Sequence, residues 1–158
     1  MFSQDAIQHS PARHALAFLA FVIPTLMVGF GWKYGLFREE YGALQMHRAD
    51  ISMVLAFGSL FIQAAFWAFV CSRLTAQGLW RRAAHLFLLA CPLGWSFAVC
   101  MVGAKHVMTS VPDFVMLESA FTVVMYLVVC PLISASYARR PPALSNDSTV
   151  QAGHNRQL

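Results

Sequence analysis

One acidic residue inside a long apolar run is the first candidate for chemistry in this sequence. Glu118 is the fifth residue of the run 114–137. A carboxylate inside a membrane helix costs free energy, so it usually faces other helices or water. Carboxylates and imidazoles bind cations and exchange protons. The sequence therefore predicts an ion or proton site at one end of the molecule, formed by Glu118, His106, Asp113, His47 and Asp50.

A structural role for Glu118 is the alternative. The carboxylate would then pair with Lys105 or Arg48, which are expected at the same level, and the pair would close the outer end of a helix bundle. Gln63 is the strongly polar residue of another apolar run, and it is expected to hydrogen-bond to a neighbouring helix.

Two Cys-Pro pairs, at 91–92 and 130–131, form a second candidate site. Counted from the ends of their apolar runs, both cysteines are expected roughly 10 to 12 Å deep in the membrane. Proline frees a backbone carbonyl, and thiols with thioethers favour soft ions such as Cu(I). The alternative is plain packing, because cysteine is a small and readily buried residue. The candidate soft-metal ligands are Cys91, Cys130, Met27 and Met125.

Sequence motifs give no support for an enzyme. The chain has no phosphate-binding glycine loop, no dinucleotide-binding motif, no H-E-x-x-H, no G-x-S-x-G and no C-x-x-C. Every histidine is expected near the end of an apolar run or in a loop, whereas a haem-binding bundle needs histidines in mid-membrane. No catalytic residue and no further cofactor are predicted.

Four long apolar runs must position these candidate sites. The chain is 58% apolar and 11% charged, and each run is long enough to cross a bilayer as a helix. A backbone in lipid must satisfy its own hydrogen bonds, which helices of this length do. Asp50 and Asp113 are expected to cap the second and fourth helices. The sequence predicts an all-α, four-helix membrane bundle with helices at about 15–32, 51–71, 83–103 and 114–137.

Basic residues flank these runs and predict the orientation. Six lie on the side of the two termini and four on the other side, so the positive-inside rule places both termini in the cytoplasm. Residues 1–14 are expected to be a cytoplasmic segment, 15–137 the membrane domain and 138–158 a disordered cytoplasmic tail. Basic residues in such positions meet lipid headgroups, so no nucleic acid is expected as a partner.

Aromatic residues after the first run suggest a family. The stretch Val28 to Phe37 with Tyr41, and the later stretch Leu117 to Phe121 followed by Pro131 and Tyr137, resemble a broad group of uncharacterised small four-helix proteins of the bacterial inner membrane. The resemblance spans 15–137. It implies a bacterial inner membrane and the same four-helix layout, and it implies no activity.

Two functions follow from these observations. The preferred interpretation is a small accessory or scaffold protein, as a homo-oligomer or as a subunit of a larger membrane complex, because four helices leave little room for a private aqueous pathway. The alternative is an oligomeric transporter or channel protomer for an ion or small molecule, using Glu118 and the two cysteines of the Cys-Pro pairs.

Overall fold

The computed structural model describes residues 11–46, 52–75 and 78–138. Within these ranges every regular element is helical. The elements in chain order are α1 Pro11–Phe30, the π-helical segment η1 Gly31–Leu36, α2 Arg38–Ala43, α3 Met53–Arg73, α4 Leu79–Trp95, the π-helical segment η2 Ser96–Met101, α5 Val102–Lys105 and α6 Val111–Ser136.

Four helices in the described part of the chain are long and apolar enough to cross a membrane. They are Pro11–Leu36, Met53–Arg73, Leu79–Lys105 and Val111–Ser136. The predicted all-α four-helix membrane bundle is therefore confirmed, and the chain is a small multi-pass integral membrane protein. The first span is longer than predicted at both ends, because polar and aromatic residues at the membrane surface continue the helix beyond its apolar run.

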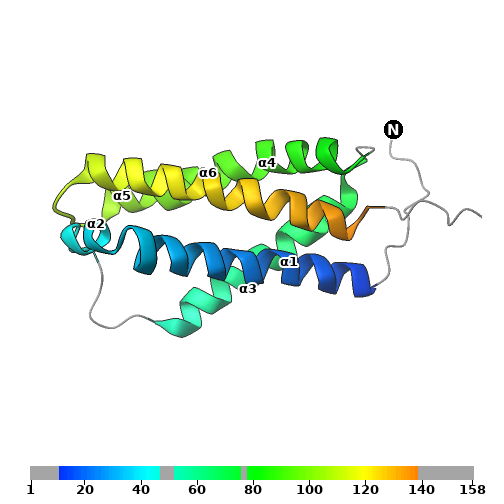
Figure 1. The fold of residues 1–158 in the computed structure, drawn as a ribbon, viewed down its shortest axis with the longest axis horizontal. Coiled ribbons are helices and arrows are strands. Elements are labelled where there is room, and N and C mark those ends of the chain that lie inside the picture. The colour runs from blue at the N-terminus through cyan, green and yellow to red at the C-terminus, as the bar shows by residue number, and fades with distance from the viewer. Residues whose placement is uncertain (1–10, 47–51, 76–77, 139–158) are drawn as a thin grey trace, which may run out of the picture.

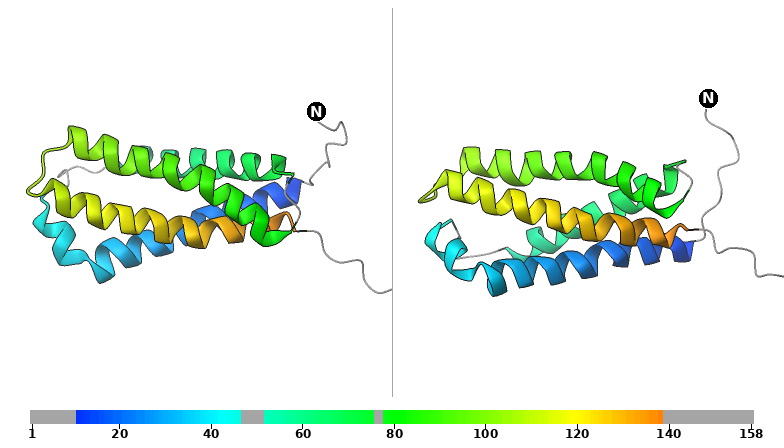
Figure 2. Two further views of the ribbon diagram at one scale, coloured as in Figure 1. Left: turned by 90° about the horizontal axis from the view of Figure 1, so that it is seen from above. Right: turned by 45° about the horizontal axis from the view of Figure 1, so that its top comes forward.

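Helix α6 is the centre of the bundle and packs against both α1 and α4. Figures 1 and 2 show these three helices side by side, whereas α3 crosses them obliquely and its first turns stand away from the others. Every buried residue of α3 lies in its second half: Ala64, Trp67, Ala68 and Cys71. That half is held at α6, where the Tyr137 hydroxyl donates to the Ala68 carbonyl at 3.0 Å and the Cys71 sulfur lies 3.9 Å from the Ser134 hydroxyl.

A glycine permits the closest approach of α4 to α6. A Cβ atom on Gly94 would lie 2.5 Å from the Tyr126 hydroxyl oxygen and 2.6 Å from a carbon of its ring. Tyr126 is 2% exposed, so its ring has little freedom to move away. The aromatic ring of α6 therefore occupies the space that a side chain at position 94 would need.

Serine residues cap two of the helices. The Ser110 hydroxyl accepts from the Asp113 backbone N–H, so the predicted cap at Asp113 is wrong by three residues, and Asp113 lies in the first turn instead. A serine cap stabilises that turn in the same way as an aspartate cap. Helix α3 is capped by Ser52, whose hydroxyl accepts from the Leu55 N–H, and Asp50 lies outside the described residues.

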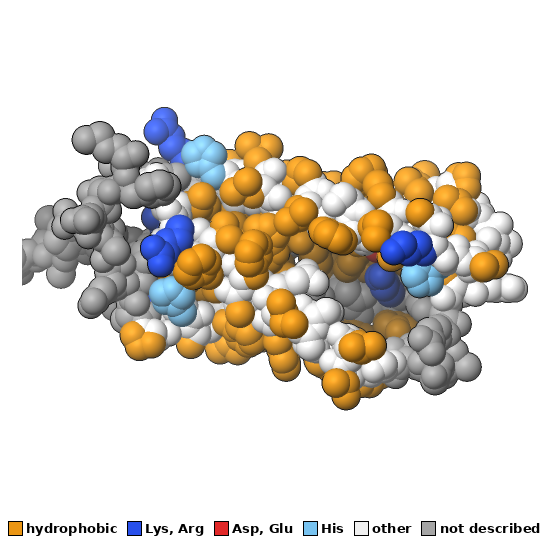
Figure 3. All heavy atoms as spheres, turned by 180° about the vertical axis from the view of Figure 1, so that it is seen from behind, with side chains coloured by type: hydrophobic (Ala, Val, Ile, Leu, Met, Phe, Trp, Pro, Cys, Tyr) orange, Lys and Arg blue, Asp and Glu red, His pale blue; other side chains and the backbone are white. Residues whose placement is uncertain are grey.

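The beginning of α1 and the end of α6 lie at the same end of the bundle (Figure 1). Figure 3 shows hydrophobic side chains over the length of the molecule, with Lys, Arg and His side chains toward its two ends. This distribution suits a bilayer, with the charged side chains at the two headgroup regions. Residues 1–10 and the predicted tail from 139 lie outside the described residues.

Candidate functional site

A partly buried ion pair joins the first and last membrane spans. The Lys33 Nζ atom lies 2.5 Å from a carboxylate oxygen of Glu118. The Glu118 side chain is 5% exposed and the Lys33 side chain 31%. Lys33 belongs to η1, the π-helical continuation of α1, and Glu118 lies about 10 Å along α6 from its first residue. Lys105, one of the two predicted structural partners of Glu118, is wrong, because the ammonium comes from Lys33. The other predicted partner, Arg48, lies outside the described residues, so that pairing stays a prediction.

Aromatic rings surround the ammonium. Lys33 Nζ lies 5.1 Å from the ring centroid of Tyr41 and 4.9 Å from that of Phe121. Trp32 packs beside them, with its ring centroid 6.1 Å from that of Phe121. A cation over an aromatic face within about 6 Å is attracted by the quadrupole of the ring. We call Glu118, Tyr41 and Phe121 the cation cage.

Helix α2 brings Tyr41 into this cage. Tyr41 is 2% exposed and packs with Phe114 of α6 in a small core cluster. The Tyr41 hydroxyl and the Trp32 indole N–H are both buried and form no hydrogen bond of normal geometry with any described group. Burial and, after it, the nearby Glu118 carboxylate raise the pKa of Tyr41 well above its ordinary value.

The raised pKa of Tyr41 predicts a loss of stability in alkali. An unfolded tyrosine ionises near pH 10, while the folded phenol stays neutral to a higher pH. The contribution of this neutral phenol is therefore fully present below about pH 10 and is lost as the pH rises toward the folded pKa. Unfolding measured from pH 8 to 12 should show a steeper loss for the wild type than for Tyr41→Phe. A tyrosinate absorbance that appears near pH 10 and is absent from Tyr41→Phe would contradict this assignment.

A cleft of about 780 Å³ lies between the helices next to the ion pair. Lys33 and Phe121 form part of its wall, and most of the remaining wall is apolar. It lies where α3 diverges from α4 and α6, and the surface is hollowed on the face shown in Figure 3. The other lining residues are Thr25, Ala56, Ser59, Leu60, Ile62, Gln63, Phe66, Trp67, Leu93, Gly94, Phe97, Ala98, Thr122, Met125 and Tyr126.

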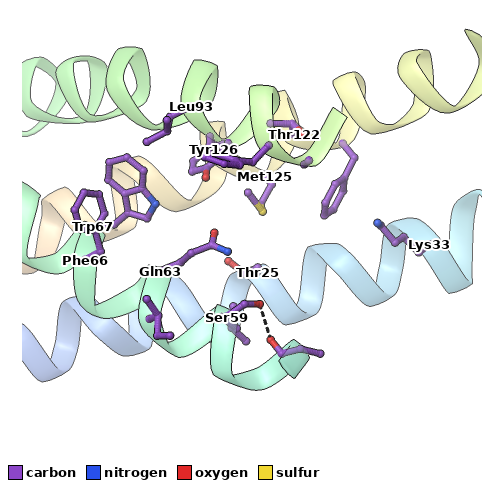
Figure 4. A pocket seen from close by; sticks show the side chains of 17 residues that line it. Thr25, Lys33, Ser59, Gln63, Phe66, Trp67, Leu93, Thr122, Met125 and Tyr126 are labelled. Atoms are coloured by element: carbon purple, nitrogen blue, oxygen red, sulfur yellow. Dashed lines mark hydrogen bonds between the residues drawn. The ribbon is translucent and has the colours of Figure 1, made fainter. Parts of the chain in front are cut away.

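Several polar groups face this cleft. Figure 4 shows Gln63 extending from α3 toward Thr25 of α1, with Lys33 at one end of the cleft. The Thr25 hydroxyl is buried without a hydrogen-bond partner among the described groups, whereas the Thr122 hydroxyl donates to the Glu118 carbonyl at 2.7 Å. Gln63 is exposed in the cleft wall and is joined by no hydrogen bond to a described residue, so the predicted bond from Gln63 to another helix is not formed. The cleft therefore offers hydrogen-bonding groups at membrane depth.

The two other predicted ion-site residues that the structure describes, His106 and Asp113, do not join Glu118. His106 is exposed and its ring Nδ1 lies 3.2 Å from the Val102 carbonyl. Asp113 is exposed in the first turn of α6. Neither forms an ion pair or hydrogen bond with the Glu118 carboxylate, and His47 and Asp50 lie outside the described residues.

Three of the four predicted soft-metal ligands lie together, and the fourth lies apart from them. Cys91, Cys130 and Met125 are buried in the same apolar cluster, as expected from their equal depth. Met27 is 70% exposed on the outside of α1, so its thioether cannot join them in one chain. No group of three or more His, Cys, Asp or Glu suited to a metal ion occurs in the described ranges. A Cu(I) site stays a prediction.

Sequence reasoning found the carboxylate but missed its surroundings. It did not connect Lys33, Trp32 or Tyr41 with Glu118, because 85 residues separate Lys33 from Glu118. One signal in the sequence could have identified the partner. A buried carboxylate needs a nearby cation, and Lys33 follows the first apolar run directly.

Comparison with known proteins adds no assignment. No protein-family model, no curated protein and no solved structure matches the chain. The resemblance to small four-helix proteins of the bacterial inner membrane therefore stays an expectation.

Proposed function

We propose that this membrane protein binds an amphiphilic small molecule in the cleft, as the binding unit of a transporter. The observation that carries the proposal is a membrane-embedded cleft of about 780 Å³ with mostly apolar walls and a charged end at Lys33. Small-molecule sites typically have volumes of roughly 300 to 1,000 Å³, with apolar walls and a few polar groups that orient the ligand.

The size of the cleft suits a small molecule. Its volume of about 780 Å³ lies within the range of roughly 300 to 1,000 Å³ that is typical of small-molecule sites. An alkyl chain or a fused ring system fits this space, and its polar end would lie beside the ion pair.

The polar groups of the cleft also favour a ligand. A polar group left without a partner in an apolar environment costs about 1 to 3 kcal/mol, and the Thr25 hydroxyl and the Gln63 amide both lie in the cleft wall. A buried ion pair contributes little net stability compared with apolar residues of the same size. Packing alone gives no reason for Thr25, Gln63 and the ion pair to be at these positions. A ligand that forms hydrogen bonds and charge contacts with them would explain their presence.

Native mass spectrometry of the protein extracted in mild detergent tests the proposal. The wild type should carry a bound amphiphile of low molecular mass. Ala98→Trp should lose most of this bound molecule, because Ala98 lies in the cleft wall and an indole would fill the space. Ala65→Trp is the matched control, since Ala65 is an exposed alanine of α3 that does not line the cleft.

Equal occupancy in the two tryptophan variants would contradict the proposal. If the wild type carries no small molecule and instead purifies with a second polypeptide in fixed ratio, the accessory or scaffold role preferred from the sequence would be favoured. Placement in a bacterial inner membrane, both termini in the cytoplasm and assembly as an oligomer belong to the same proposal. They are supported by the basic residues at the helix ends and by the apolar outer faces of the bundle.

A further inference from the structure

We propose that the cation cage is an organic-cation site that Lys33 occupies when no ligand is bound. The ligand class is a cationic amphiphile, such as an alkylammonium, whose charged nitrogen replaces the Lys33 ammonium while its apolar part lies in the cleft. The inference rests on the proposed function and names the substrate class of the same cleft.

The surroundings of the Lys33 ammonium carry the inference. One carboxylate oxygen of Glu118 lies 2.5 Å away and two ring centroids lie at 4.9 and 5.1 Å. A carboxylate together with aromatic faces is the arrangement that binds ammonium and quaternary ammonium groups. Lys33 and Phe121 also line the cleft, so the cage borders the space where a ligand would lie.

Lys33 is suited to leave the cage. Its side chain is 31% exposed, whereas that of Glu118 is 5% exposed. Lys33 lies in the last turns of the first span, where a long flexible side chain can place its ammonium in the headgroup region. The Glu118 carboxylate stays behind beside the buried Tyr41 hydroxyl, which can donate a hydrogen bond to it.

A cation suits this cage better than an anion. An anionic ligand would have to approach the buried Glu118 carboxylate, whose charge Lys33 already balances. A cation that replaces Lys33 keeps the carboxylate paired, so no uncompensated charge is created in the apolar region.

Chemical labelling of the wild-type protein tests the exchange directly. The chain has two lysines, Lys33 and Lys105, so Lys105 is an internal control. We expect dodecyltrimethylammonium, added to protein in an uncharged detergent, to increase the acetylation rate of Lys33 by about threefold or more, given the protection expected from its ion pair. Lys105 should not respond, and 1-dodecanol should affect neither residue. An unchanged Lys33 rate at saturating cation would overturn the inference.

Removing the built-in occupant provides the second test. Lys33→Met should bind dodecyltrimethylammonium about tenfold more tightly than the wild type, because a tethered group competes at an effective millimolar concentration. Lys105→Met should bind like the wild type. Lys33→Met/Glu118→Gln should lose this gain, because the carboxylate charge is gone. If the double variant keeps the tighter binding of the cation, the inference is overturned. If Lys33→Met does not fold, the labelling of wild-type Lys33 decides whether the exchange occurs.

The two proposals fail in different ways. If both 1-dodecanol and the cation bind, and binding is blocked by Ala98→Trp but not by Glu118→Gln, the cleft binds amphiphiles without a cation site. If neither probe binds the wild type or Lys33→Met, the proposed function itself is wrong.

Discussion

Lys33→Met is expected to destabilise the protein by about 3 kcal/mol, and adding Glu118→Gln is expected to recover most of that loss. The single change removes an ammonium from a carboxylate that is 5% exposed. The remaining Glu118 must then keep an unpaired charge in apolar surroundings or take up a proton. The double change leaves a neutral amide beside an apolar chain. Unfolding in detergent, followed by circular dichroism, gives the free energies.

Two comparisons make this result specific. Lys105→Met removes an ammonium that forms no ion pair with Glu118, so the change should stay within about 0.5 kcal/mol of the wild type. Glu118→Gln alone should cost less than Lys33→Met, because Lys33 is 31% exposed and its ammonium can reach water. Equal stability of the wild type and Lys33→Met would show that the ion pair has no energetic role.

Gly94→Leu is expected to reduce stability by about 3 kcal/mol and to reduce ligand binding as well. A Cβ atom at this position would overlap the Tyr126 side chain, 2.5 Å from its hydroxyl oxygen and 2.6 Å from a ring carbon. Because Tyr126 is nearly fully buried, α4 must move away from α6, and both residues also line the cleft. The midpoint of unfolding in detergent and the bound amphiphile in native mass spectrometry measure the two effects.

Gly58→Leu is the matched control for this change. Gly58 also lies in a membrane-spanning helix, but nothing lies within 4 Å of a Cβ placed there. The substitution should therefore change stability by less than about 0.5 kcal/mol. Similar losses in both variants would mean that added volume in a membrane helix, rather than contact with Tyr126, causes the effect.

Hydropathy predicted the fold because lipid restricts a membrane-spanning backbone to very few structures. Runs of about 20 apolar residues must be helical to satisfy their backbone hydrogen bonds, so four runs give four spans. The residues that cap the helices were harder to predict. Asp113 and Ser110 both suit a helix start, and the choice of Ser110 depends on where the chain enters the helix after its loop.

The candidate site was only half predictable for a geometrical reason. Glu118 is conspicuous because a carboxylate is rare in an apolar run. Its partner depends on which residues the end of the first span presents to α6, and η1 departs there from the regular helical repeat. The burial of Tyr41 depends on α2 folding back onto α6, which no periodicity in six residues predicts.

The pairing of Lys33 with Glu118 also determines how the protein responds to the electrical potential of its membrane. A potential of 100 mV acts on one elementary charge with up to about 2.3 kcal/mol. Opposite charges at the same depth experience opposing forces, so the potential does no net work on the pair when both residues move together. Voltage acts on this site only when the two charges separate.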